Sequence, residues 1–155
     1  VFVAYIYIYR MSPNRKFWGI HKPLIGSSSC VFIGSSLIID HHHPPRSGDT
    51  TFWSSTGMFP QELIIKLGST AQVTRVKTLT TNAKLVVVER CEGVAPISWE
   101  KVFEMEAADT DGRLQVESTQ VGKKTANFLK FKFMSGWDEF VTVHKIVVEG
   151  KTSGR

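Results

Sequence analysis

The chain has 155 residues, of which 42% are hydrophobic and 21% are charged, and its net charge at pH 7 is +5. This length suits one domain with a sizeable core, and the composition is ordinary for a soluble globular protein. Residues 1–46 hold five basic side chains against one acid, so they contribute +4 and leave the other residues at +1. The excess charge lies in the first third, which excludes a nucleic-acid-binding domain with a basic folded face.

The first 39 residues differ from the rest of the chain. Val1–Tyr9 is apolar, but it is shorter than the roughly 20 residues that a membrane span needs, and it lacks the pattern of a signal peptide. We interpret it either as an edge strand or as the start of an atypical extension. The expected organisation is an N-terminal extension over 1–39, or an incorrect gene-model boundary there, then a β-sandwich over 40–150 and a tail over 151–155.

From residue 51 onward, short β-branched segments alternate with turns rich in Gly, Asn and Asp, among them GST (68–70), TTN (80–82) and DTDGR (109–113). Their spacing of about ten residues, without an amphipathic helix, predicts an all-β antiparallel sandwich. The expected strands are Glu62–Leu67, Ala71–Leu79, Ala83–Arg90, Ile97–Glu106, Arg113–Val121, Phe128–Phe133 and Phe140–Gly150.

The segment FLKFKF is the clearest of these strands. Successive side chains of a strand point to opposite faces. Leu129, Phe131 and Phe133 should therefore share the face toward the core, while Lys130 and Lys132 point the other way.

Two segments carry residue types that suit catalysis or transition-metal binding. In Asp40–Pro45 (DHHHPP), three consecutive histidines cannot all face one ion, and no second cluster accompanies them, so we expect a polar loop. Gly26–Cys30 (GSSSC) lacks the closing glycine of a nucleophile elbow, and Cys91 ends an apolar strand. Without a paired acid and base, the sequence predicts no enzyme.

Gly48–Trp53 (GDTTFW) is a candidate calcium loop. The carboxylate of Asp49 and the hydroxyl of Thr51 are the hard oxygen ligands that calcium prefers. In the alternative interpretation, Asp49 only caps a turn by accepting backbone N–H groups.

The stretch TFWSSTGMFPQELII (51–65), preceded by HPP (43–45), resembles the signature of the intraflagellar transport protein 25 family. In that family an acid and His-Pro-Pro lead into Thr-Phe-Trp-x-x-Thr-Gly-x-Phe-Pro-Gln-Glu, and Asp40 matches the acid. The matching motif residues are Thr51, Phe52, Trp53, Thr56, Gly57, Phe59, Pro60, Gln61 and Glu62.

The resemblance implies a galactose-binding-domain-like (discoidin-like) jelly roll with no catalytic activity. It implies a subunit of the intraflagellar transport B complex that pairs with a Rab-like small GTPase, intraflagellar transport protein 27, and contacts other B-complex subunits. The expected location is the cilium or flagellum and the basal body, with a cytoplasmic pool. Within the motif, Phe52 and Trp53 are expected to anchor the sandwich, and Gly57 and Pro60 to shape the turn.

Arg46 is a departure from the family pattern. It stands where the family's calcium loop has an Asp, in a segment that is shortened before Thr51. The implied calcium site therefore keeps Asp49 as its nearby carboxylate, and we expect weaker binding than the family pattern implies.

The second functional hypothesis is a carbohydrate-binding module, since the discoidin-like fold includes many lectins. Trp137, Asp138 and His144 would then form the sugar site at the loop tips. The competing interpretation of WDEF (137–140) places its aromatics in the core and uses its acids to cap a turn.

Overall fold

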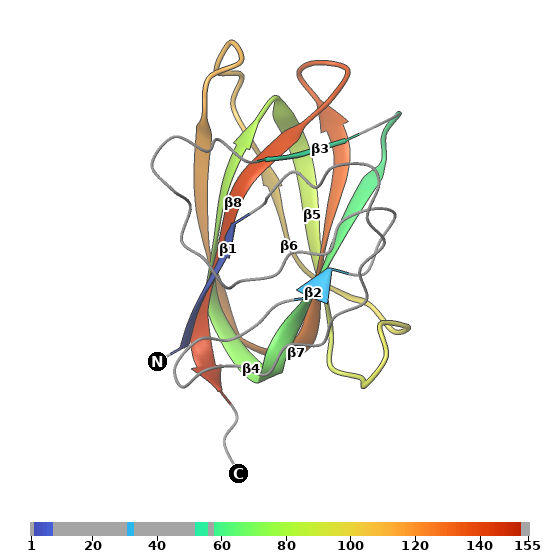
Figure 1. Cartoon of the computed structure of the whole chain (residues 1–155), viewed down its shortest axis with the longest axis vertical. Helices are drawn as coiled ribbons and strands as arrows, with labels where there is room; N and C mark the ends of the chain where they lie inside the picture. The colour runs from blue at the N-terminus through green and yellow to red at the C-terminus, as the bar shows by residue number, and fades with distance from the viewer. Residues whose placement is uncertain (1, 8–30, 33–51, 56–57, 153–155) are drawn as a thin grey trace, which may run out of the picture.

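A computed structural model describes residues 2–7, 31–32, 52–55 and 58–152 of the chain (Figure 1). No helix occurs in this part, and so none that is long and apolar enough to cross a membrane. The strands are β1 (Phe2–Tyr7), β2 (Val31–Phe32), β3 (Trp53–Ser54), β4 (Gln61–Thr81), β5 (Ala83–Cys91), β6 (Glu100–Glu106), β7 (Gln115–Gly136) and β8 (Thr142–Thr152).

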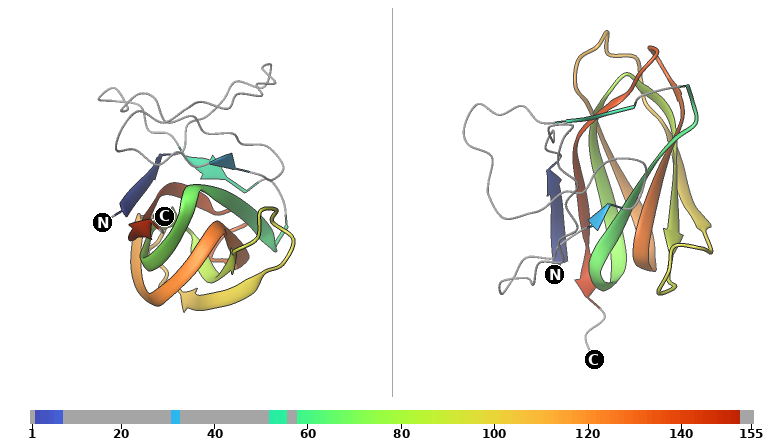
Figure 2. Two further views of the ribbon diagram at one scale, coloured as in Figure 1. Left: turned by 90° about the horizontal axis from the view of Figure 1, so that it is seen from below. Right: turned by 45° about the vertical axis from the view of Figure 1, so that its right-hand side comes forward.

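These strands form one antiparallel sheet in the order β1-β8-β4-β7-β5-β6, with β2 beside β4 and β3 beside β8. The sheet curls on itself so that its two halves face each other around the core (Figure 2). The predicted all-β antiparallel sandwich is confirmed.

β4 and β7 are each one long strand where the sequence predicts two. They pair from Gln61 opposite Phe133 to Thr80 opposite Gln115, with one register shift across the Gly-Ser-Thr segment of β4 and a second between Val73 and Arg75. A bulge of this kind accommodates extra residues and bends a strand without ending its ladder. Both strands therefore pass from one layer of the sandwich into the other.

Two predicted turns are present, and both place residues in the left-handed backbone region. Asn82, at φ 58°, joins β4 to β5. Asp111 and Gly112, at φ 55° and 71°, lie in the loop between β6 and β7, where Asp109 Oδ1 accepts a hydrogen bond from the backbone N–H of Asp111. Asn, Asp and Gly tolerate this conformation better than other residues do.

The core lies between the two layers and follows the alternation of FLKFKF. Leu129, Phe131 and Phe133 are buried, and the register places Phe131 between Leu63 of β4 and Val88 of β5. Burying each of these side chains stabilises the fold by about 1.5–3 kcal/mol. The predicted inward face of this strand is confirmed.

The N-terminal region supplies two described strands. β1 runs antiparallel to β8, from Phe2 opposite Gly150 to Tyr7 opposite Lys145, and β2 lies beside Ile65 of β4. Phe2–Tyr7 thus takes the position of an edge strand.

Candidate functional site

The motif residues 52–55 lie against the start of β8. Trp53 is opposite Val143 in the ladder. Ser55, which is buried, donates its backbone N–H to the carbonyl oxygen of Val141 at 3.0 Å, and its Oγ accepts the N–H of Val141 at 2.9 Å. This reciprocal pair fixes residues 52–55, which we call the corner, beside Val141, a core residue that directly precedes β8.

The two aromatics of the Phe-Trp pair have different environments. Trp53 is half-buried, and its ring stacks on that of Phe133 with centroids 5.7 Å apart. Phe52 is 41% exposed, and its ring centroid lies 5.5 Å from that of His144. The expectation that both anchor the sandwich holds for Trp53 and fails for Phe52, because neighbouring strand residues face opposite sides.

The turn after the corner packs on the end of β7. The Gln61 side chain donates to the carbonyl oxygen of Met58 at 2.7 Å, and the Phe59–Pro60 peptide is cis. A Cβ added to Gly136 would lie 2.7 Å from the ring of Phe59, so the glycine leaves room for this ring. The motif thus depends on a glycine far away in the sequence.

Glu62 ends the motif on the outer face of the sheet. Its carboxylate lies 3.9 Å from the ammonium groups of both Lys130 and Lys132. Lys130 is buried, with its ammonium 2.7 Å from the carboxylate of Glu89 and 4.3 Å from the ring centroid of Trp99. Because Glu62 is exposed, its own pairs contribute little to stability, whereas the half-buried Glu89 is the close counter-ion of the buried Lys130 ammonium.

His144 lies beside the corner, and burial lowers the pKa of its imidazole. Its Nε2 is 3.0 Å from Thr142 Oγ1, which is itself hydrogen-bonded to Thr81 Oγ1. With Phe52 against the ring, the imidazole is half-buried between a hydroxyl pair and an aromatic.

The predicted calcium ligands lie outside the described residues. This applies to Asp49 and Thr51, and also to Asp40–Pro45 and to Thr56 and Gly57 of the motif. Within the part of the chain that the structure describes, no three His, Cys, Asp or Glu side chains gather in a way that could hold a metal ion. Calcium binding stays a prediction.

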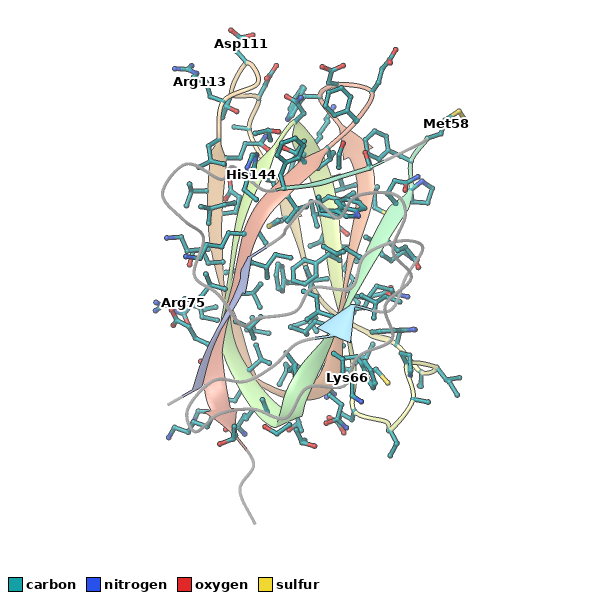
Figure 3. The ribbon with its side chains drawn as sticks, viewed as in Figure 1. Met58, Lys66, Arg75, Asp111, Arg113 and His144 are labelled. Atoms are coloured by element: carbon teal, nitrogen blue, oxygen red, sulfur yellow. The ribbon has the colours of Figure 1, made fainter. Side chains whose placement is uncertain are left out.

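Four exposed apolar side chains lie in the motif and in the segment between β7 and β8, which is joined to the motif at Val141. The sequence interpretation placed the aromatics of residues 137–140 in the core, but Trp137 and Phe140 are both exposed. The indole N–H of Trp137 donates to the carbonyl oxygen of Ala107 at 2.9 Å, and the ammonium of Lys84 lies 4.5 Å from its ring centroid. Met58 stands at the tip of the motif's turn, at the same end as Asp111 (Figure 3). We name Phe52, Met58, Trp137 and Phe140 the corner patch.

No protein-family model matches the sequence. Intraflagellar transport protein 25 of Chlamydomonas reinhardtii is 42% identical over 115 residues, which are 72% of this chain and 60% of the algal protein. The human homolog is 31% identical over 125 residues, and the alignment covers 76% of this chain and 87% of the human protein. The chain belongs to the intraflagellar transport protein 25 family. It spans less than two thirds of the length of its algal relative.

Solved structures that resemble this family member show the discoidin-like fold. A family 32 carbohydrate-binding module (CBM32-5) from Clostridium perfringens, in complex with GalNAc-β-1,3-galactose, matches with a TM-score of 0.59 at 16% identity, over 78% of this chain and 94% of the module. The chitosan-binding module 1 of a Paenibacillus chitosanase/glucanase matches with a TM-score of 0.58 at 22% identity, over 67% of this chain and 80% of the module. At these identities the likeness establishes the fold alone. The predicted galactose-binding-domain-like sandwich is confirmed.

Proposed function

We propose that this chain is a non-enzymatic adaptor subunit of the intraflagellar transport B complex. In this role it pairs with the Rab-like small GTPase intraflagellar transport protein 27, and it acts in the cilium or flagellum and at the basal body, with a cytoplasmic pool. The observation that carries the proposal is the 42% identity to the algal protein, together with 31–32% identity to the human and mouse homologs.

The corner patch supports a protein-binding role. Exposed aromatic and methionine side chains are enriched at protein interfaces, where they contribute much of the binding energy. The Ser55–Val141 pair and the turn at Gln61 hold the patch in place before a partner arrives. Little conformational entropy is then lost on binding.

Co-expression with the Rab-like partner, followed by size exclusion with and without EGTA, tests the proposal. We expect a one-to-one complex, which Met58→Asp weakens because it places a charge in the corner patch. Val94→Asp is the matched control, since Val94 is also almost fully exposed (96%, against 88% for Met58) but lies in the loop between β5 and β6. If the wild type folds but stays monomeric in the presence of the GTPase, the adaptor function is contradicted.

We further propose that calcium binds weakly through Asp49 and Thr51. Calcium affinity increases with the number of charged oxygen ligands, and Arg46 replaces one of them. In calorimetric titrations, Asp49→Ala should abolish binding and Arg46→Asp should strengthen it. If calcium does not bind to the wild type and Arg46→Asp does not restore it, Gly48–Trp53 is only a capped turn.

A carbohydrate-binding module is the second candidate, favoured by the fold shared with sugar-binding modules. The geometry of Trp137 opposes it. A sugar needs an open aromatic face, whereas Lys84 lies over this ring and the indole N–H is already bonded. A glycan array with the purified chain decides between the two, and a specific signal lost in Trp137→Ala would favour the module.

A further inference from the structure

The loop between β5 and β6, residues 92–99, presents two large aliphatic side chains to solvent. Val94 is 96% exposed and Ile97 is 83% exposed. Single exposed aliphatic residues are common on protein surfaces, but two of them within four positions at the tip of one loop are unusual. Both side chains lie outside the hydrophobic core of the sandwich.

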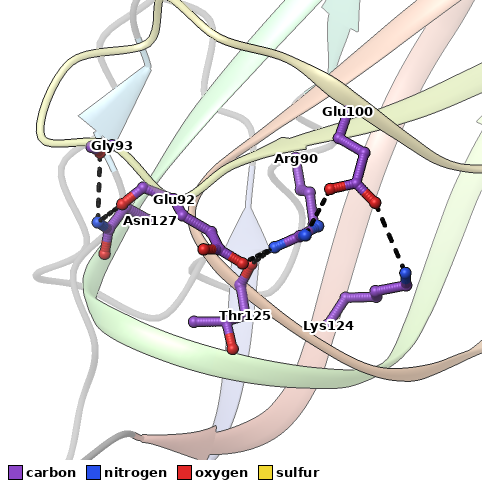
Figure 4. Close-up of polar contacts among 7 residues, drawn as sticks. All are labelled: Arg90, Glu92, Gly93, Glu100, Lys124, Thr125 and Asn127. Carbon is purple, nitrogen blue, oxygen red and sulfur yellow. Dashed lines mark hydrogen bonds and ion pairs between the residues drawn. The ribbon is translucent and has the colours of Figure 1, made fainter.

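Side chains of the neighbouring strands hold the base of this loop in place. The amide of Asn127 donates to the carbonyl oxygens of Glu92 at 2.6 Å and Gly93 at 3.2 Å, and Thr70 Oγ1 donates to the Asn127 oxygen at 2.6 Å. Figure 4 shows the Asn127 contacts beside the network described below. The base of the loop is thus fixed by β7 and by the bend of β4.

Hydrogen bonds within the loop also fix its conformation. The thiol of Cys91 donates to the carbonyl oxygen of Ala95 at 3.3 Å, and the backbone N–H of Ile97 donates to the same oxygen at 2.9 Å. The exposed side chains therefore stand on an ordered support. A preorganised apolar tip loses little conformational entropy when a partner covers it.

Charged groups at the base of the loop pair with one another. The guanidinium of Arg90 contacts the carboxylates of Glu92 and Glu100, and Lys124 lies 3.6 Å from Glu100 (Figure 4). These ion pairs raise the pKa of Arg90 and lower the pKa of Glu100. The seven residues from Gly93 to Trp99 contain no charged side chain.

This charge pattern points to the chemistry of the partner. Nucleic acids and anionic membrane surfaces are recognised through uncompensated Lys and Arg, whereas Arg90 and Lys124 at the base of this loop are paired with carboxylates. An apolar tip within a charge-balanced surround complements an uncharged apolar pocket on a folded protein.

The loop lies at the opposite end of the sandwich from the corner patch. β5 runs from the hairpin at Asn82 to Cys91, so it carries the chain from the end near Met58 to the other end (Figures 1 and 3). A partner on the corner patch therefore leaves the loop accessible.

We propose that this loop is a second docking element, in which Val94 and Ile97 insert into an uncharged apolar pocket of a folded protein other than the GTPase. This inference rests on the proposed adaptor function and deepens it. The chain then joins two partners through opposite ends of one rigid sandwich.

The test compares the wild type with the double variant Val94→Asp/Ile97→Asp in two assays. One measures binding to the GTPase partner, and the other measures incorporation of the resulting pair into B complex purified without this subunit. We expect the double variant to melt at the wild-type temperature and to bind the GTPase normally. Its affinity for the remaining complex should fall by about tenfold or more, as expected for two buried anchor residues.

Met58→Asp should show the opposite pattern: its affinity for the GTPase should fall in the first assay. If the double variant enters the complex with wild-type affinity, the loop proposal is wrong while the adaptor function stands. If the wild type binds neither the GTPase nor the complex, both are wrong. Two further results would also overturn the proposal. If the wild type sediments with phosphatidylcholine–phosphatidylserine vesicles and the double variant does not, the loop binds a membrane. If the wild type dimerises with increasing concentration and the double variant does not, the loop binds a second copy of this chain.

Discussion

The indole of Trp53 stacks on the ring of Phe133, with ring centroids 5.7 Å apart and planes inclined by 28°. This contact joins the motif to a strand 80 positions further along the chain, and it packs the corner against the hydrophobic core. Aromatic pairs of this kind stabilise proteins beyond the effect of the apolar area they bury. The proposed partner-binding corner and the stability of the sandwich are thereby coupled.

Replacement of Trp53 by Ala should lower the free energy of unfolding by about 3 kcal/mol, because a large ring is removed from a packed site. Phe52→Ala is the matched control. Phe52 is 41% exposed and does not belong to the core, so its loss should cost less, about 1 kcal/mol. Urea denaturation followed by circular dichroism measures both, and equal costs would contradict the stacking role of Trp53.

Gly136→Ala should destabilise the chain by about 1–3 kcal/mol through overpacking. The added methyl group would lie 2.7 Å from the ring of Phe59 and 2.8 Å from the carbonyl oxygen of Asn82. Combining the change with Phe59→Leu should restore only part of the loss, since the carbonyl is backbone and has no room to move. A double-mutant cycle in urea measures this, and a wild-type midpoint for Gly136→Ala would refute the close approach.

Gln115→Leu should cost about 2 kcal/mol or more, because it leaves buried polar groups without partners. Gln115 is 3% exposed, accepts hydrogen bonds from Ala83 N and Thr80 Oγ1, and donates to the carbonyl oxygens of Ala83 and Ala108. It thereby ties the β4–β5 hairpin to the β6–β7 loop. Ser118→Ala, on the exposed side of the same strand, should leave the thermal midpoint close to that of the wild type. A similar midpoint for both variants would show that the amide network contributes little.

The stability contributed by His144 should fall as the pH decreases. Burial lowers its pKa in the folded state, so the unfolded chain binds the proton more tightly. This contribution is fully present above the pKa of the unfolded state, about 6.5, and is lost as the pH falls through the lower pKa of the folded state. Urea unfolding of the wild type and of His144→Gln measures this at pH 7.5 and at pH 5. The difference between their free energies of unfolding should be smaller at pH 5. A constant difference would mean that the imidazole titrates alike in both states.

The sequence predicted the inward face of FLKFKF and the hairpin turn at Asn82, because strand alternation and turn preferences depend on neighbouring residues. It left Trp137 open between the core and an exposed sugar site, and it placed Phe140 in the core. The position of Trp137 is set from a distance: its backbone N–H donates to the carbonyl oxygen of Asn82, and its indole N–H donates to that of Ala107 in the β6–β7 loop. A reading of local hydrophobicity assigns such residues to the core.

By itself, the sequence determined the strand content, the sandwich class and the motif that marks the family, since these depend on alternation, turn residues and a contiguous stretch. Only the tertiary structure decided that β4 and β7 continue through their turn-like segments, and that Gly136 makes space for Phe59. It alone also placed the corner patch and the β5–β6 loop at opposite ends. These features depend on contacts between residues far apart in the chain, where a ladder partner or a packed ring outweighs the local preference of Gly, Ser or Trp.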